Sequence, residues 1–143
     1  MAAQTWTLFD QTTNEHIGYK KLGGHAEFSV HRGGVSEGVE MVSIDAGKLK
    51  VHVLPTRGMS LWKASYDGEA IGWKSPTRGP VHPSLVPLFE PSGLGWLDGF
   101  DELLVRCGLE SNGAPEHDPE TKQLIYPLPV SYTHLTLPTT PYV

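Results

Sequence analysis

Four short runs rich in Val, Ile, Leu, Trp and Met follow one another between residues 39 and 73, with a turn signal in each gap. The runs are Val39–Asp45, Leu49–Leu54, Met59–Tyr66 and Ala70–Trp73. Apolar runs of this length that are bounded by turns are typical of β-strands. This spacing predicts a meander of short strands.

The gaps between these runs carry residues that suit tight turns. Asp45-Ala46-Gly47 can close one hairpin, and Pro55-Thr56-Arg57-Gly58 can form a second corner. Asp67-Gly68 is the strongest signal, because both central residues of the favoured two-residue hairpin turn need φ > 0. We therefore expect neighbouring strands to pair as hairpins.

Apolar residues alternate with polar ones in Leu49-Lys50-Val51-His52-Val53. Alternation places Lys50 and His52 on the outward face of a strand whose other face is buried, as in an antiparallel sheet packed on one side. Gly (16) and Pro (12) together make about one fifth of the 143 residues, which favours turns over long helices. No helical period persists for more than about two turns. The predicted class is all-β.

The prolines concentrate in residues 75–93, which hold five of the twelve. So many prolines exclude a central strand or a long helix, so we expect a long ordered loop with a helical turn at Ser84–Phe89. Long loops on β scaffolds often carry binding groups.

Outside the four runs and this loop the patterns are weaker. Residues 1–9 are predicted as an opening strand, and residues 11–26 as a leader or covering loop. Asp101–Leu109 returns to strand character, and Glu110–Thr121 is predicted as a polar loop.

Charge and cysteine content restrict the partners and the location of the protein. The net charge of -5 comes from interspersed side chains, and no basic cluster exceeds the pair Lys20 and Lys21, so neither nucleic acid nor a membrane surface is expected as a partner. The single Cys107 cannot form an internal disulfide, which fits a reducing compartment. Met1–Asp10 lacks the pattern of a signal peptide. We expect a cytoplasmic protein of unknown oligomeric state.

No cofactor or metal is expected from the motifs. Glu116-His117-Asp118 is a weak metal candidate, because adjacent residues on an extended loop diverge in direction and no second ligand pair stands at usable spacing. Gly23-Gly24 and Gly33-Gly34 lack the helix and the Lys that follow in a phosphate loop. No Ser/His/Asp arrangement rises above chance.

The last part of the chain differs in composition from the rest. Residues 130–140 are rich in Thr and contain no charge. This string resembles one translated frame of the transposon end and primer used in sequencing libraries, so we expect the native sequence to stop near Leu128 or Pro129. The alternative is a genuine Thr-rich β tail. The predicted organisation is thus 1–26, an N-terminal strand and covering loop; 27–129, the N-terminal part of one β-sandwich domain; and 130–143, a non-native tail.

Three ordered stretches carry a resemblance to a known family. They are Val53–Leu61, with its Pro-Thr-Arg-Gly-Met turn; Ser75–Pro83, with Val-His-Pro at its end; and Gly93–Pro115, which contains Cys-Gly-Leu and Asn-Gly-Ala-Pro. Together they resemble the uncharacterised aldose-1-epimerase-like family, relatives of galactose mutarotase. The resemblance covers residues 27–128 and implies part of that family's large β-supersandwich.

The resemblance also implies a function. Members of this group hold a sugar across the concave face of a sheet, and catalytic members open or epimerise it at the anomeric carbon with an acid and a base, usually His and Glu. The family's Leu-His-Gly-Arg motif would follow Tyr126-Pro127-Leu128, where the foreign tail begins. We therefore expect no catalytic residue in this chain and no turnover by it. The alternatives are a non-catalytic sugar-binding protein of the same fold and an unrelated β-sandwich interaction module.

Five residues are candidates for binding the sugar. Arg57 could hydrogen-bond sugar hydroxyls with its guanidinium, or it could brace its own turn. His82 could face the cleft, although a lone histidine is more often structural. Trp96 could stack on a pyranose, or simply pack in the core. Glu110 and Asn112 follow a predicted strand end, where short polar side chains often meet ligands; for Asn112 an Asx turn is the alternative.

Overall fold

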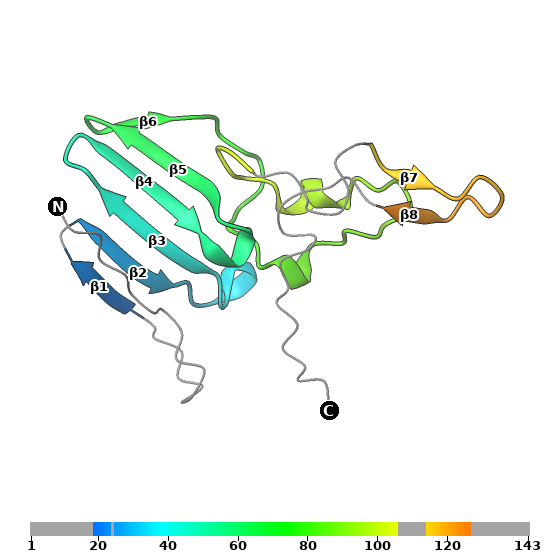
Figure 1. Cartoon of the computed structure of the whole chain (residues 1–143), viewed down its shortest axis with the longest axis horizontal. Coiled ribbons are helices and arrows are strands. Elements are labelled where there is room, and N and C mark those ends of the chain that lie inside the picture. The colour runs from blue at the N-terminus through cyan, green and yellow to red at the C-terminus, as the bar shows by residue number, and fades with distance from the viewer. Residues whose placement is uncertain (1–18, 24, 106–113, 127–143) are drawn as a thin grey trace, which may run out of the picture.

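The computed structural model describes residues 19–23, 25–105 and 114–126, which form two antiparallel sheets (Figure 1). The larger sheet has six strands that neighbour one another in chain order, and the smaller is a two-stranded hairpin. The six strands are β1 (Tyr19–Gly23), β2 (Ala26–Val30), β3 (Glu40–Asp45), β4 (Leu49–Leu54), β5 (Ser60–Tyr66) and β6 (Glu69–Ile71). The predicted all-β class is confirmed.

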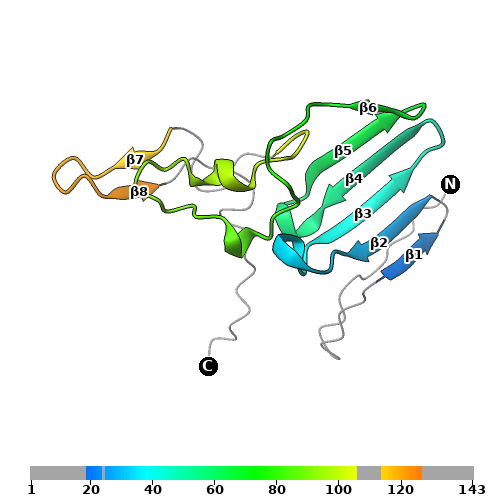
Figure 2. The ribbon, with the colours of Figure 1, turned by 180° about the vertical axis from the view of Figure 1, so that it is seen from behind.

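The rest of the described chain forms an arm that extends away from the six-stranded sheet (Figures 1 and 2). Its elements are the short 3-10 helices η3 (Pro83–Leu85) and η4 (Gly95–Gly99) and the hairpin strands β7 (Glu116–His117) and β8 (Leu124–Tyr126). Two further 3-10 turns, η1 (Gly34–Ser36) and η2 (Pro55–Arg57), connect strands of the large sheet. No helix in the described ranges is long and apolar enough to cross a membrane.

Strands β3 to β6 form the predicted meander. Strand β4 has the predicted bounds, and the starts of β3, β5 and β6 differ from prediction by one residue each. The turn between β5 and β6 has φ of 52° at Asp67 and 88° at Gly68, as the Asp-Gly signal requires. The predicted helical turn is shorter than expected and begins at Pro83.

Three sequence predictions outside the meander need correction. Within the predicted covering loop 11–26, Tyr19–Gly23 is a strand, because its backbone pairs with β2 despite the lack of alternation. Of the strand predicted at Asp101–Leu109, the structure describes residues 101–105, and these form an isolated bridge from Leu104 to Leu61 in place of a strand. The buried side chains of the neighbouring Asp101 and Glu102 bond to other segments instead. Within Glu110–Thr121, β7 forms a hairpin with β8. The opening strand predicted at 1–9 lies outside the described residues.

Register divides the large sheet into a polar and an apolar face. On one face Glu27 pairs with Ser43, and Ser43 with His52 on the next strand. On the other face Ile44 pairs with Val51, and the row continues through Ala64 to Ile71. Because successive side chains of a strand point to opposite faces, these rows lie on opposite sides of the sheet.

The apolar face is only partly covered. Phe28 is buried, whereas Ile44, Leu49, Tyr66 and Ile71 each keep 41–54% of their surface exposed. A separate small apolar cluster lies in the arm, where Val81 and Val86 pack with Leu88 and Trp96. The polar side chains on the opposite face therefore stand on a sheet that is held together mainly by the pairing of its strands.

Candidate functional site

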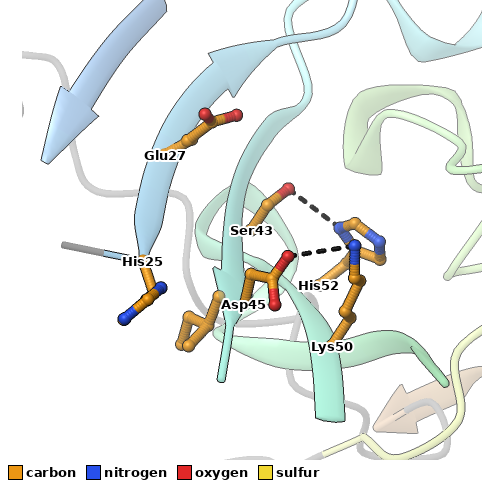
Figure 3. Close-up of a pocket in the computed structure, with 7 residues that line it drawn as sticks. His25, Glu27, Ser43, Asp45, Lys50 and His52 are labelled. Atoms are coloured by element: carbon orange, nitrogen blue, oxygen red, sulfur yellow. Dashed lines mark hydrogen bonds and ion pairs between the residues drawn. The ribbon is translucent and has the colours of Figure 1, made fainter. Parts of the chain in front are cut away.

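A hollow of about 350 Å³ lies on the polar face of the large sheet, over β2, β3 and β4 (Figure 3). Its volume is within the range of small-molecule pockets, about 300–1,000 Å³. The polar lining residues are His25, Glu27, Ser43, Asp45, Lys50 and His52, and Ile44, which belongs to the apolar row, also contributes to the lining. The concentration of charged and polar side chains over one hollow makes it the candidate functional site.

The β3–β4 hairpin brings most of these side chains together. Its register pairs Ser43 with His52 and Asp45 with Lys50, so two polar pairs stand on one face, two residues apart along each strand. Strand β2 adds Glu27, which pairs with Ser43 from the other side. The site is thus built on three paired strands, which hold side chains more rigidly than loops do.

Two side-chain contacts organise the hollow (Figure 3). The Ser43 hydroxyl lies 2.9 Å from Nδ1 of His52, and Nζ of Lys50 lies 3.0 Å from Oδ2 of Asp45. The hydrogen bond from Lys50, followed by the one from the Gly47 amide, lowers the pKa of Asp45, so this carboxylate stays ionised. Burial, and then the charge of Lys50, lower the pKa of His52, which favours the neutral imidazole.

The cluster of polar side chains continues beyond the hollow, next to a bulge in β5. His52 pairs with Lys63 and Val53 pairs with Leu61, so Trp62 is an extra residue on β5. The Trp62 ring lies 6.3 Å from the ring of His52 and 5.5 Å from that of His31. Burial, and then His52, lower the pKa of His31. Two neutral imidazoles therefore flank one indole beside the hollow.

The arrangement suits a polar, hydroxyl-rich ligand. Carboxylates accept hydrogen bonds from hydroxyl groups, an ammonium donates them, and a neutral imidazole can donate and accept at once. A neutral imidazole can also take up a proton near neutral pH. Across the described ranges, no group of three or more His, Cys, Asp and Glu side chains is arranged to hold a metal ion.

Arg57 lies away from the hollow, and its side chain is fully buried. Its Nε donates to Oε1 of the equally buried Glu102 at 2.6 Å. Its two terminal nitrogens donate to the carbonyl oxygens of Val81, at 2.6 Å, and Gly99, at 2.8 Å. These are the contacts of a brace, and they join η2 to the proline-rich loop at Val81 and to the end of η4 at Gly99.

His82 and Trp96 lie near the same brace. The Nδ1 atom of His82 lies 2.7 Å from the Ser84 hydroxyl and accepts from the Ser84 amide, so this side chain caps η3. Trp96 packs against the apolar cluster of the arm, and its ring centroid lies 5.0 Å from that of Phe100. The structure thus places these two residues and Arg57 around Val81, and none of the three lines the hollow.

The other two predicted site residues, Glu110 and Asn112, lie outside the described residues. Sequence reasoning did not select the residues of the hollow, although the alternation in Leu49–Val53 places Lys50 and His52 on the polar face. The sequence prediction did not include the register of the β3–β4 hairpin. A turn at Asp45–Gly47 pairs Ser43 with His52, and this pairing would have identified the cluster.

The chain matches known proteins in two comparisons, while a search of the curated proteins found no match. One solved structure, a protein from Klebsiella pneumoniae subsp. pneumoniae described as a "putative aldose 1-epimerase", is similar with a TM-score of 0.71 and 33% identity. The similarity covers 86% of this chain and 34% of that protein, so the chain spans about a third of its length. The aldose-epimerase-like fold is therefore confirmed. Residues 36–133 match a family model described as Domain of unknown function (DUF4432), and the chain belongs to that family.

Proposed function

We propose that the whole protein carrying this chain is a carbohydrate-binding, aldose-1-epimerase-like protein that interconverts anomers or epimers of a sugar. The observation that carries this proposal is the similarity, at 33% identity over 86% of the chain, to the Klebsiella pneumoniae protein. The hollow on the polar face is a second support, because its size and its hydrogen-bonding groups suit a monosaccharide. The single cysteine fits a reducing compartment, and we propose the cytoplasm.

Within this chain the proposed role is binding. Glu27 and Asp45 would accept hydrogen bonds from sugar hydroxyls, and His52 would donate or accept one. The brace at Arg57 would act indirectly, by holding the proline-rich loop at Val81 and the end of η4 at Gly99 next to η2. We retain Glu110 and Asn112 as proposed ligand contacts.

Anomer interconversion needs a base that removes the proton of the anomeric hydroxyl and an acid that protonates the ring oxygen. The C1 to ring-oxygen bond then breaks, and it closes again on the other face of the carbonyl. The sequence contains no Leu-His-Gly-Arg motif, which the family resemblance associates with this chemistry. We therefore assign no catalytic residue in the chain, and we expect it to bind a sugar without accelerating this reaction.

The experiment is a mutarotation assay on the whole protein. Freshly dissolved α-D-glucose and α-D-galactose are followed by polarimetry with and without enzyme. The proposal predicts a rate above the buffer rate that increases in proportion to protein concentration. If none of a panel of aldoses and ketoses reacts faster than in buffer, the enzymatic function is wrong.

The second candidate is a sugar-binding protein of the same fold without catalysis. The observation that favours it is that residues of this chain form the polar hollow, whereas we assign no acid and base pair to them. It predicts saturable heat of binding for at least one sugar in calorimetry, together with an unchanged mutarotation rate. The third possibility, an unrelated interaction module, predicts neither result, and the similarity in fold argues against it.

A further inference from the structure

Asp101 is a buried acid whose carboxylate belongs neither to the hollow nor to the brace. It lies in the arm, and only 3% of its surface is exposed. Its Oδ2 accepts a hydrogen bond from Nε1 of Trp62 at 2.6 Å, whereas Oδ1 has no partner in the part of the chain that the structure describes. A buried carboxylate with an unpaired oxygen lowers the stability of the fold. Stability alone therefore does not account for a carboxylate at this position.

The proline-rich loop packs directly on this carboxylate. A Cβ atom at Gly79 would lie 2.6 Å from Oδ2 of Asp101, closer than a side chain can approach, so the glycine permits the contact. The carboxylate is thus held from the side of the loop as well as by the indole of Trp62.

Asp101 holds two neighbouring residues of β5. Its carboxylate accepts from the indole of Trp62, and its carbonyl oxygen accepts from Nζ of Lys63 at 3.0 Å. The same Nζ lies 3.9 Å from Oδ2 of Asp101 and 5.5 Å from the centre of the Trp62 ring. One residue of the arm therefore sets the direction of two adjacent side chains of the sheet.

Trp62 is the extra residue at the bulge of β5, so the regular alternation of the strand does not set its direction. Bulges often re-aim a side chain beside a functional site. The indole that Asp101 holds meets the ring of His31 at 5.5 Å and that of His52 at 6.3 Å, edge to face in both cases.

These contacts converge on His52, which lines the hollow (Figure 3). On the β3 side of its ring the Ser43 hydroxyl lies 2.9 Å from Nδ1. On the β5 side Trp62 meets the ring, and Lys63 is the cross-strand partner of His52. Both neighbours on the β5 side are held by Asp101.

We propose that Asp101 is a positioning residue for the hollow, because through Trp62 and Lys63 it fixes the orientation of the His52 ring. This inference rests on the proposed function in one respect, since the ligand that His52 meets is the sugar proposed above. Asp101 is not among the residues that line the hollow, so its effect is indirect. It acts through the hydrogen bond that it accepts, and an amide that keeps an acceptor oxygen should replace it.

The pKa of His52 reports how closely its ring is held. Burial, followed by the charge of Lys50, lowers this pKa, so a ring that loses the indole at its edge becomes more exposed and its pKa rises toward the ordinary 6.5. Other titratable groups surround the ring, and the variants below leave all of them in place: His31 beside Trp62, Lys63 on β5, and His25, Glu27 and Asp45 in the hollow.

The test is a pH titration of the chain without ligand, followed by the NMR signal of the His52 ring, which a His52→Asn variant assigns. Asp101→Ala removes the acceptor of the indole and should raise the pKa of His52 toward 6.5. Asp101→Asn keeps an acceptor oxygen and should leave this pKa unchanged. Trp62→Phe removes the donor instead, should also raise the pKa, and keeps the test decisive if Asp101→Ala does not fold.

Two control variants separate positioning from a general weakening of the arm. Asp98→Ala removes an exposed carboxylate of η4. Trp73→Phe removes a different hydrogen bond to the arm, the one to the carbonyl oxygen of Glu102. Both should leave the titration of His52 unchanged.

An unchanged pKa of His52 in Asp101→Ala and Trp62→Phe would overturn the inference. A lower pKa in Asp101→Ala and Asp101→Asn alike would also overturn it, because the charge of Asp101 would then act in place of its hydrogen bond. Neither result involves a sugar, so the mutarotation assay decides the proposed function separately. In a following titration with D-galactose, Asp101→Ala should bind severalfold more weakly than Asp101→Asn, and equal affinities would contradict the positioning role.

Discussion

The brace and the hollow use the same kinds of charged side chain in opposite environments. Arg57 and Glu102 form an ion pair with no exposed surface, and their groups bond within the protein. Asp45 and Lys50 form a pair of similar geometry, but about half of each side chain is exposed. The comparison shows that burial, and not residue type, separates a structural ion pair from groups that are available to a ligand.

The two regions are physically connected through Trp62. Its ring touches the histidines beside the hollow, and its Nε1 donates to Oδ2 of the buried Asp101 at 2.6 Å. Asp101 precedes Glu102, the partner of Arg57, and its amide donates to that carboxylate at 3.1 Å. Variants of these residues can therefore test whether a change in the brace also alters the hollow.

The largest effect is expected at the brace. Arg57→Ala should lower the free energy of unfolding by about 3–5 kcal/mol, because it leaves the Glu102 carboxylate buried without its charge partner. Urea unfolding of the chain, followed by tryptophan fluorescence, measures the change. Arg32→Ala is the matched control, since Arg32 pairs with Glu37 at 3.0 Å on the surface and should matter little. Equal effects of the two variants would contradict the assignment of Arg57 as a brace.

A smaller loss is expected at the connection between the regions. Trp62→Phe keeps a ring beside His52 but removes the hydrogen bond to Asp101, at a cost of about 1–3 kcal/mol for a buried acceptor that loses its donor. Trp73→Phe is the control, because Trp73 is 46% exposed and water can replace its bond to the Glu102 carbonyl. If Trp62→Phe also left the His52 NMR signal unchanged, the two regions would be independent.

The pH dependence should come from the histidines beside the hollow. Their folded pKa values lie below the ordinary 6.5, so the unfolded chain binds more protons and stability falls as the pH drops through 6.5 toward the folded values. Above pH 6.5 this contribution is fully present. Urea midpoints between pH 8 and pH 5 measure it, and the double variant His31→Gln, His52→Gln should flatten the curve. An unchanged slope in that variant would show that other groups are responsible.

The smallest effect on stability is expected at the exposed pair. Lys50→Met should leave the urea midpoint unchanged within error, because exposed ion pairs contribute little to folding. The same change should alter sugar binding in the hollow. Lys48→Met, which removes a comparable surface pair with Asp67 at 3.2 Å, is the control and should leave both properties unchanged. A lower urea midpoint in Lys50→Met but not in Lys48→Met would show instead that the pair of Asp45 and Lys50 stabilises the fold.

The sequence was sufficient to predict the meander from β3 to β6, because the hydrophobic runs and the Asp67-Gly68 turn are local signals. Strand β1 could not be predicted, since Tyr19–Gly23 has no alternation and is defined by its partner strand. The role of Arg57 was left open for a similar reason: its partner Glu102 lies 45 residues away in the sequence.

The candidate site was only partly accessible to sequence reasoning. Alternation placed Lys50 and His52 on the polar face, but the hollow also depends on Glu27, which joins through the pairing of β2 with β3. Trp96 was predicted as a possible sugar contact from its residue type, and His82 from its place in the long loop. The contacts that the structure shows for both are with the arm itself. Residue type alone could not distinguish these roles, because burial is set by the tertiary fold.

The most direct test of the account compares two NMR reporters in one titration of the chain with D-galactose. The His52 ring reports on the hollow, and the Trp96 indole N–H reports on the region around Val81 and Arg57. The account predicts a saturable shift of the His52 signal and no shift of the Trp96 signal. A shift of Trp96 with an unchanged His52 would contradict it and would move the sugar site to the loop beside the brace.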